Sequence, residues 1–71
     1  MSWNHRVIKN GNSYAIHEVY YSDNNEIMAS TQIPVGVEWE EGEDPIFTIE
    51  SMQQAIEKPV LTFIDDKLVE L

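Results

Sequence analysis

The sequence contains no cysteine and no long hydrophobic run. The absence of cysteine excludes disulfides and thiolate metal sites. It also fits a protein of the reducing cytoplasm. No apolar run approaches the roughly 20 residues needed to cross a bilayer. The first residues also lack the basic and then apolar pattern of a secretory signal. We therefore expect an unprocessed cytoplasmic protein that does not bind membranes.

Basic residues are also scarce. The chain has 13 aspartates and glutamates against 4 lysines and arginines, for a net charge of -9. This balance argues against direct nucleic-acid binding through a basic patch. The acids gather in one segment that contains Glu38, Glu40, Glu41 and Glu43, whereas residues 1–17 contain none. This segment is either a solvated loop, which is the simpler interpretation, or an acidic interaction loop that meets a basic partner.

The length of the chain, 71 residues, limits its hydrophobic core and its means of stabilisation. A chain of this size forms a single domain and buries a modest fraction of its surface. Small domains are commonly stabilised by disulfides, by a structural metal or by a partner subunit. Because the chain has no cysteine, a partner subunit is the remaining means of stabilisation that we consider.

The first half of the sequence predicts three β-strands, at residues 3–9, 14–21 and 26–33. These segments are rich in β-branched and aromatic residues. Residues 10–13 and 22–25 carry the glycine and asparagines of tight turns. Pro34 ends the third strand because it lacks a backbone donor.

The second half predicts one amphipathic helix at about residues 45–57. Asp44 is expected as its N-cap, with Pro45 at the first helical position. Ile49, Met52 and Ile56 follow at spacings of three and four. Residues 60–64 are either a fourth strand or an extended segment over the core, and residues 65–71 are expected to fray. The expected fold is α+β: a three-stranded antiparallel β-meander packed on one helix (β-β-β-α), with a short extended C-terminal segment, in one domain at 1–64.

Hairpin geometry predicts two unlike sheet faces. Odd positions of the first strand should lie opposite even positions of the second. The face with the larger apolar groups, which include Trp3, Val7 and Ile16, is expected to face the helix. The opposite face is a possible partner-binding surface, carrying Arg6, His17, Tyr21, Met28 and Gln32 beside Ile8 and Val19. Exposed together, its apolar residues would exceed the patch that a small monomer normally shows, so we expect a homodimer or a protein partner to cover it.

No catalytic or metal-binding constellation is recognisable in the sequence. His5 and Glu18 could lie across from each other and support acid–base chemistry, but no nucleophile or oxyanion donor accompanies them. A structural hydrogen bond is therefore the favoured interpretation. The two histidines fall on opposite faces, and residues 23–34 lack the glycine and the final glutamate of a calcium loop. We predict no enzymatic activity, no cofactor and no metal site.

Several segments resemble a family of short bacterial proteins with no assigned activity. The resemblance rests on residues 3–7, 14–21 and 58–61, with Thr31, Pro34, Val35 and Met52 between them, and residues 17–21 are its most specific part. The sequence departs from that pattern at Pro45 and Gln53, where apolar residues are usual. A looser similarity, at the level of the fold, is to the β-β-β-α antitoxins of the HicB type. Neither resemblance implies catalytic residues.

Two functions are compatible with these observations. The first is a small non-enzymatic protein-interaction module, homodimeric or bound to another protein, that uses the sheet face around Arg6 and His17. The alternative is an acidic inhibitor or antitoxin-like protein whose acidic loop occupies a basic site on another protein.

Overall fold

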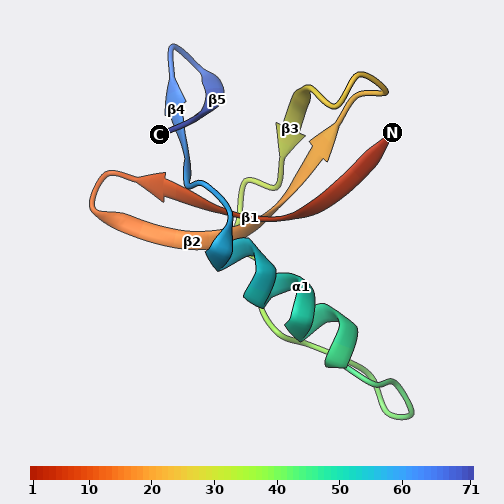
Figure 1. Cartoon of the computed structure of the whole chain (residues 1–71). Helices are drawn as coiled ribbons and strands as arrows, with labels where there is room; N and C mark the ends of the chain where they lie inside the picture. Colours follow the sequence, from red (N-terminus) through yellow and green to blue (C-terminus); the bar gives the residue numbers. More distant parts are fainter.

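The computed structural model describes all residues, 1–71, and has an α+β fold with one helix and one five-stranded mixed sheet (Figure 1). The elements in chain order are β1 (Ser2–Asn10), β2 (Ser13–Tyr21), β3 (Ile27–Ser30), α1 (Ile46–Glu57), β4 (Leu61–Ile64) and β5 (Lys67–Glu70). The strand order in the sheet is β3-β2-β1-β4-β5, so β3 and β5 are its two edges.

The β1–β2 hairpin has the predicted register. His5 lies opposite Glu18, and Arg6 lies opposite His17. Gly11, with φ of 60°, supplies the left-handed backbone conformation that the tight turn requires. The predicted division of these two strands into odd and even faces is therefore confirmed.

The pairing of β3 departs from the predicted register. Tyr20 lies opposite Ala29 as expected, but a register shift then places Tyr21 opposite Ile27. The shift moves Ile27 to the other face, where it packs against Ile8 and Val19. A bulge of this kind adds one residue to a strand, which inverts the faces beyond it and leaves no clear signal in the alternation.

The predicted three-stranded antiparallel sheet is wrong, because β4 and β5 extend it beyond β1. β4 runs parallel to β1, with Ile8 opposite Leu61, and β5 pairs antiparallel with β4. A parallel neighbour needs a long crossover, which the segment containing α1 provides. Local patterns specify hairpins between successive strands, but they do not show which free edge a distant strand will join.

Residues 65–71, expected to fray, form a turn and β5 instead. Asp65 and Asp66 have φ values of 51° and 63°, which suit a two-residue hairpin turn. Leu68 packs against the buried cluster, and the Leu71 amide donates to the Val60 carbonyl at 2.9 Å. The hairpin therefore orders the end of the chain.

The helix packs on the predicted sheet face, where His5 contacts Ser51, but the main buried cluster lies on the opposite face, contrary to the prediction. Ile8, Val19 and Leu61 are buried together, and Tyr21, Ile27 and Leu68 pack around them. The face that bears His5 contacts α1, so the even-numbered face of β1 that bears Ile8 points away from the helix. Figure 1 shows β3 and the β4–β5 hairpin rising from β1 and β2 on the side away from α1. The sheet therefore curves, and its outer strands β3 and β5 bring Ile27 and Leu68 onto the cluster.

The helix begins and ends close to the predicted positions. The helix begins at Ile46 with Pro45 as its N-cap, one residue later than predicted, and the Asp44 Oδ1 atom accepts a hydrogen bond from the Ile46 amide at 3.0 Å. Met52 and Ala55 are the buried residues of α1. Ile49 and Ile56, predicted to face the core, are 41% and 70% exposed.

The helix and residues 36–45 project from the sheet as an arm, after the Thr31 and Val35 amides have donated to carbonyls of β2 (Figure 1). The radius of gyration is 12.7 Å, against about 11 Å expected for a compact domain of this length. No helix in the structure combines the length and the apolar character needed to cross a bilayer. The elongated shape leaves much of the arm exposed to solvent.

Candidate functional site

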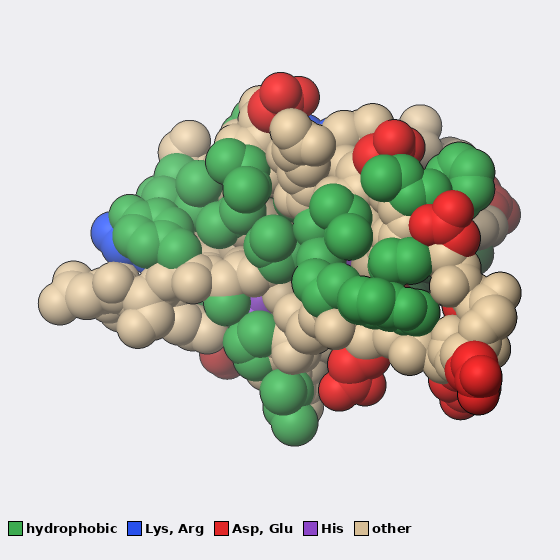
Figure 2. Space-filling view, turned by 90° about the horizontal axis from the view of Figure 1, so that it is seen from below, with side chains coloured by type: hydrophobic (Ala, Val, Ile, Leu, Met, Phe, Trp, Pro, Cys, Tyr) green, Lys and Arg blue, Asp and Glu red, His purple; other side chains and the backbone are tan.

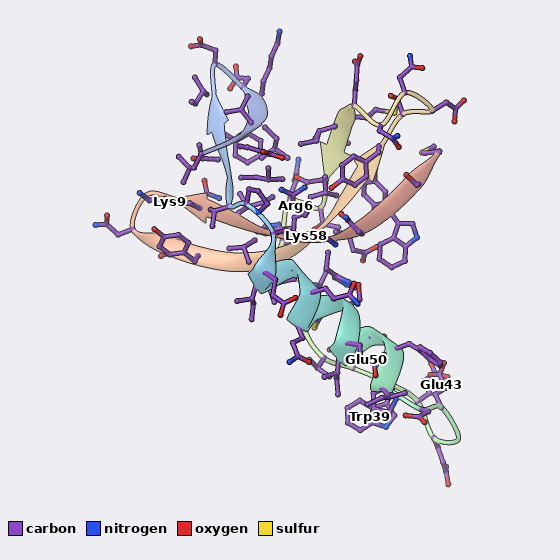
Figure 3. All side chains as sticks on the ribbon, in the orientation of Figure 1. Arg6, Lys9, Trp39, Glu43, Glu50 and Lys58 are labelled. Carbon is purple, nitrogen blue, oxygen red and sulfur yellow. The ribbon has the colours of Figure 1, made fainter.

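Arg6, predicted to lie on a partner-binding face, is buried and bound within the chain. One η nitrogen donates to the Tyr21 hydroxyl at 3.1 Å, and the other donates to the Pro59 carbonyl at 2.8 Å. The exposed carboxylate of Glu70 lies 3.7 Å from the second nitrogen. The Tyr21 hydroxyl in turn donates to Asn4 at 2.7 Å. Arg6 therefore ties β1 to β2, to the α1–β4 connection and to β5, and Figure 3 shows it among the strands.

A shallow cavity of about 290 Å³ lies beside Arg6, and Lys58 also lines it. Two cations at one cavity are notable in a chain that has few of them. Both Arg6 η nitrogens already donate to acceptors within the chain. The Arg6 Nε atom is buried without a hydrogen-bond partner.

His17, also predicted for the partner-binding face, is buried as well. Its Nδ1 atom lies 2.9 Å from the Thr31 carbonyl oxygen. A carbonyl can only accept, so this nitrogen carries the proton and donates. The Thr31 amide donates to the Glu18 carbonyl at 2.9 Å. His17 therefore holds the chain where it leaves β3.

The remaining residues predicted for that face lie nearer the surface. Tyr21 is half-buried, whereas Met28 and Gln32 are exposed. Met28 and Gln32 lie together on the wall of a groove of about 600 Å³. The structure thus separates the predicted set into a buried pair, Arg6 and His17, and a pair that lines an open groove.

The groove lies between the two edges of the sheet. All four residues of β3 line one wall with Glu26 and Gln32, and residues 66–69 line the other with Phe63. Ile27 and Leu68 also pack on the buried cluster, so the floor of the groove is apolar. Sequence reasoning missed this groove because it did not predict β5. The aspartate pair at 65–66, followed by Leu68 and Val69, is the signal that could have indicated a hairpin.

The acidic segment, predicted as a solvated loop or an interaction loop, is exposed at the far end of the arm. The predicted residues are Glu38, Glu40, Glu41 and Glu43, and all four are exposed. The Glu40 amide donates to the Glu43 carboxylate at 2.8 Å, and the Glu43 amide donates to the Glu40 carbonyl at 3.0 Å. Gly42, with φ of 87°, allows this turn. Figure 3 shows Trp39 and Glu43 at the end of the arm remote from the sheet.

The structure contains no cluster of three or more histidine, cysteine or acidic side chains arranged to hold a metal ion.

His5 and Glu18 lie across from each other as predicted, yet each binds a different partner. His5 Nδ1 lies 2.7 Å from the Ser51 hydroxyl of α1. Glu18 accepts a hydrogen bond from the Tyr20 hydroxyl at 3.3 Å. Desolvation and the nearby Glu18 carboxylate raise the pKa of Tyr20. Neither cavity is lined by His5 or Ser51, so their contact serves to anchor α1 to β1.

An exposed apolar stripe runs along α1. It consists of Ile46, Ile49 and Ile56, which recur at spacings of three and seven along the helix. The three side chains are solvent-exposed in the chain. Figure 2, which views the molecule from below, shows hydrophobic side chains exposed in several groups, with acidic side chains beside them. We call these three residues the α1 stripe.

Comparison with protein-family models, with curated proteins and with solved structures finds no match to this chain. The structure itself presents two candidate sites: the α1 stripe and the groove between β3 and β5. Sequence periodicity predicted Ile49 and Ile56 of the stripe to face the core, and it did not predict their exposure.

Proposed function

We propose that this chain is a small non-enzymatic protein-interaction module that forms a homodimer through the α1 stripe. The observation that carries the proposal is the exposure of Ile46, Ile49 and Ile56 on one side of the helix. Apolar side chains exposed to water carry an unfavourable free energy that a partner relieves by covering them. A second copy of the chain presents the same surface, which suits the self-complementary contact of a two-fold dimer.

The area of the chain supports a partner of about its own size. Its accessible surface is 5497 Å², roughly 1,000 Å² more than the value of about 4,500 Å² expected for a monomer of 8.2 kDa. A stable protein–protein interface buries about 800 Å² on each partner. The excess area is therefore of the size that one standard interface would cover.

Charge favours an antiparallel arrangement of the two helices. Lys58 follows the C-terminal end of α1, whereas Glu43 and Asp44 precede its N-terminal end. In an antiparallel pair, Lys58 of each protomer would approach the acids of the other. Opposite helix dipoles would also lie side by side, which is favourable.

The acidic alternative has one supporting observation. The carboxylates of Glu38, Glu40 and Glu41 are exposed at the tip of the arm and form no ion pair within the chain. Solvated carboxylates, however, are stable without a partner. Covering exposed isoleucines, in contrast, lowers the free energy of the protein. The homodimer is therefore the preferred function.

The oligomeric state of a charged variant tests the proposal. We expect the unaltered chain to scatter light as a dimer at micromolar concentration. The double variant Ile49→Glu with Ile56→Glu should be a monomer, because it places like charges at the centre of the proposed interface. Both positions are exposed in the single chain, so the far-ultraviolet circular dichroism should be retained.

The matched control is Gln54→Glu, an exposed position on a different side of α1 that acquires the same charge. This variant should remain dimeric. A chain that is monomeric without any substitution, or a double variant that remains dimeric, would contradict the proposed interface.

A further inference from the structure

The two edges of the sheet face one groove and pair with no other strand. β3 lines one wall of the groove over its whole length, and residues 67–69 of β5 line the other. The sheet order ends at these two strands, so neither has a neighbour on its outer side. An unpaired edge presents backbone donors and acceptors that can accept an additional strand.

The register identifies backbone groups that point outward from each edge. The Thr31 amide donates to Glu18 of β2, and the Leu71 amide donates to Val60 beside β4. Residues on an antiparallel edge alternate between bonding to the neighbour and pointing away from it. Ser30 of β3 and Leu68 of β5 therefore offer their backbone groups to the groove.

The floor and the mouth of the groove differ in chemistry. Ile27 and Leu68 pack on the buried cluster below, which makes the floor apolar. The walls include Glu26 and Asp66 against one cation, Lys67. The neighbouring turn residue Asp65 adds a further carboxylate, whereas Asp23 of the other turn already pairs with the N-terminal ammonium at 2.8 Å.

We propose that this groove binds an extended segment of another protein, in which apolar and basic side chains alternate, as an additional strand between β3 and β5. Successive side chains of a strand point to opposite faces. One set would enter the apolar floor, and the other would meet the acidic mouth. Main-chain hydrogen bonds to an edge strand, with pockets for alternate side chains, are an established mode of peptide recognition.

This site is separate from the proposed dimer interface. The groove lies on the side of the sheet away from α1, whereas the α1 stripe lies on the arm. Each can therefore exist without the other, and a monomeric variant should still bind a peptide in the groove.

A fluorescein-labelled peptide of alternating lysine and valine tests the groove by fluorescence anisotropy. We expect saturable binding of this peptide to the full chain. The corresponding glutamate–valine peptide should bind at least about tenfold more weakly because it opposes the acidic mouth. A lysine–valine peptide N-methylated at every residue keeps its charge but cannot donate backbone hydrogen bonds, and it should lose a similar factor.

Variants of the chain locate the binding. Glu26→Gln with Asp66→Asn should weaken binding of the lysine–valine peptide by about threefold or more, and asparagine tolerates the positive φ of position 66. The control Glu38→Gln with Glu41→Gln removes the same charge at the tip of the arm and should leave the affinity unchanged.

Several results would overturn the proposal: no saturable binding, equal binding of the N-methylated peptide, or equal weakening by the control variant. Binding by the Ile49→Glu, Ile56→Glu variant should match that of the unaltered chain. This measurement separates a failure of the groove from a failure of the dimer. Loss of peptide binding in that variant, with its fold retained, would also contradict a site independent of α1.

Discussion

Arg6 carries a positive charge into the interior, where only 6% of the residue is exposed. Its acceptors are Tyr21 and Pro59, which belong to parts of the chain far apart in sequence. Burial of a charge is costly unless hydrogen bonds replace the lost water. The guanidinium therefore acts as a cross-link that requires β2 and the α1–β4 connection to be in place together.

Replacing Arg6 with alanine should lower the free energy of unfolding by about 2–4 kcal/mol, because the Pro59 carbonyl and the Tyr21 hydroxyl lose their donor. Urea denaturation measures the change. Glu70→Gln removes the distant, exposed carboxylate and should cost less than about 1 kcal/mol. Equal costs for the two variants would show that the ion pair, instead of the hydrogen bonds, accounts for the role of Arg6.

At the scale of elements, the β4–β5 hairpin completes the core. Leu61 is fully buried, and Leu68 of the adjacent strand packs beside it. β1 has β2 on one side and β4 on the other, so the hairpin makes β1 a central strand. The segment expected to fray is thus part of the folded unit.

The substitution Leu68→Ala should destabilise the protein by roughly 1–2 kcal/mol, because it removes apolar contacts from a partly buried position. Ile64→Ala is the control, since Ile64 is 54% exposed in the neighbouring strand, and it should cost less than about 0.5 kcal/mol. Thermal or urea denaturation compares the two variants. A frayed C-terminal segment would make both substitutions neutral, in conflict with the structure.

At the scale of the whole molecule, few side chains are buried for a folded chain. Only 8 of 71 residues are buried, and the dimensions are 42 × 31 × 21 Å. Small domains with little core commonly depend on a disulfide, a structural metal or a partner subunit for stability. The homodimer proposed above would supply the missing buried area along the α1 stripe.

Association predicts a stability that depends on protein concentration. The unfolding midpoint should rise by a few degrees for each tenfold increase in concentration, because mass action favours the associated, folded state. Differential scanning calorimetry over a concentration series measures this shift. The Ile49→Glu, Ile56→Glu variant should show a lower midpoint that is independent of concentration. A concentration-independent midpoint for the unaltered chain would contradict a dimer that is coupled to folding.

The sequence by itself determined the local elements of this protein. Turn residues and alternation specified the β1–β2 hairpin and its register, since both depend on neighbouring residues. Pro45 and the spacing of Ile49 and Met52 specified the position of α1 for the same reason.

Only the tertiary structure decided which surfaces are covered. The parallel pairing of β4 with β1 joins residues that are distant in sequence, and it buries Arg6 and Ile8 on the face expected to meet a partner. The same sheet brings its two edges, β3 and β5, to one groove. Periodicity shows that a side chain belongs to one face of an element, but whether that face meets protein or solvent depends on the placement of the other elements. That placement left Ile49 and Ile56 exposed.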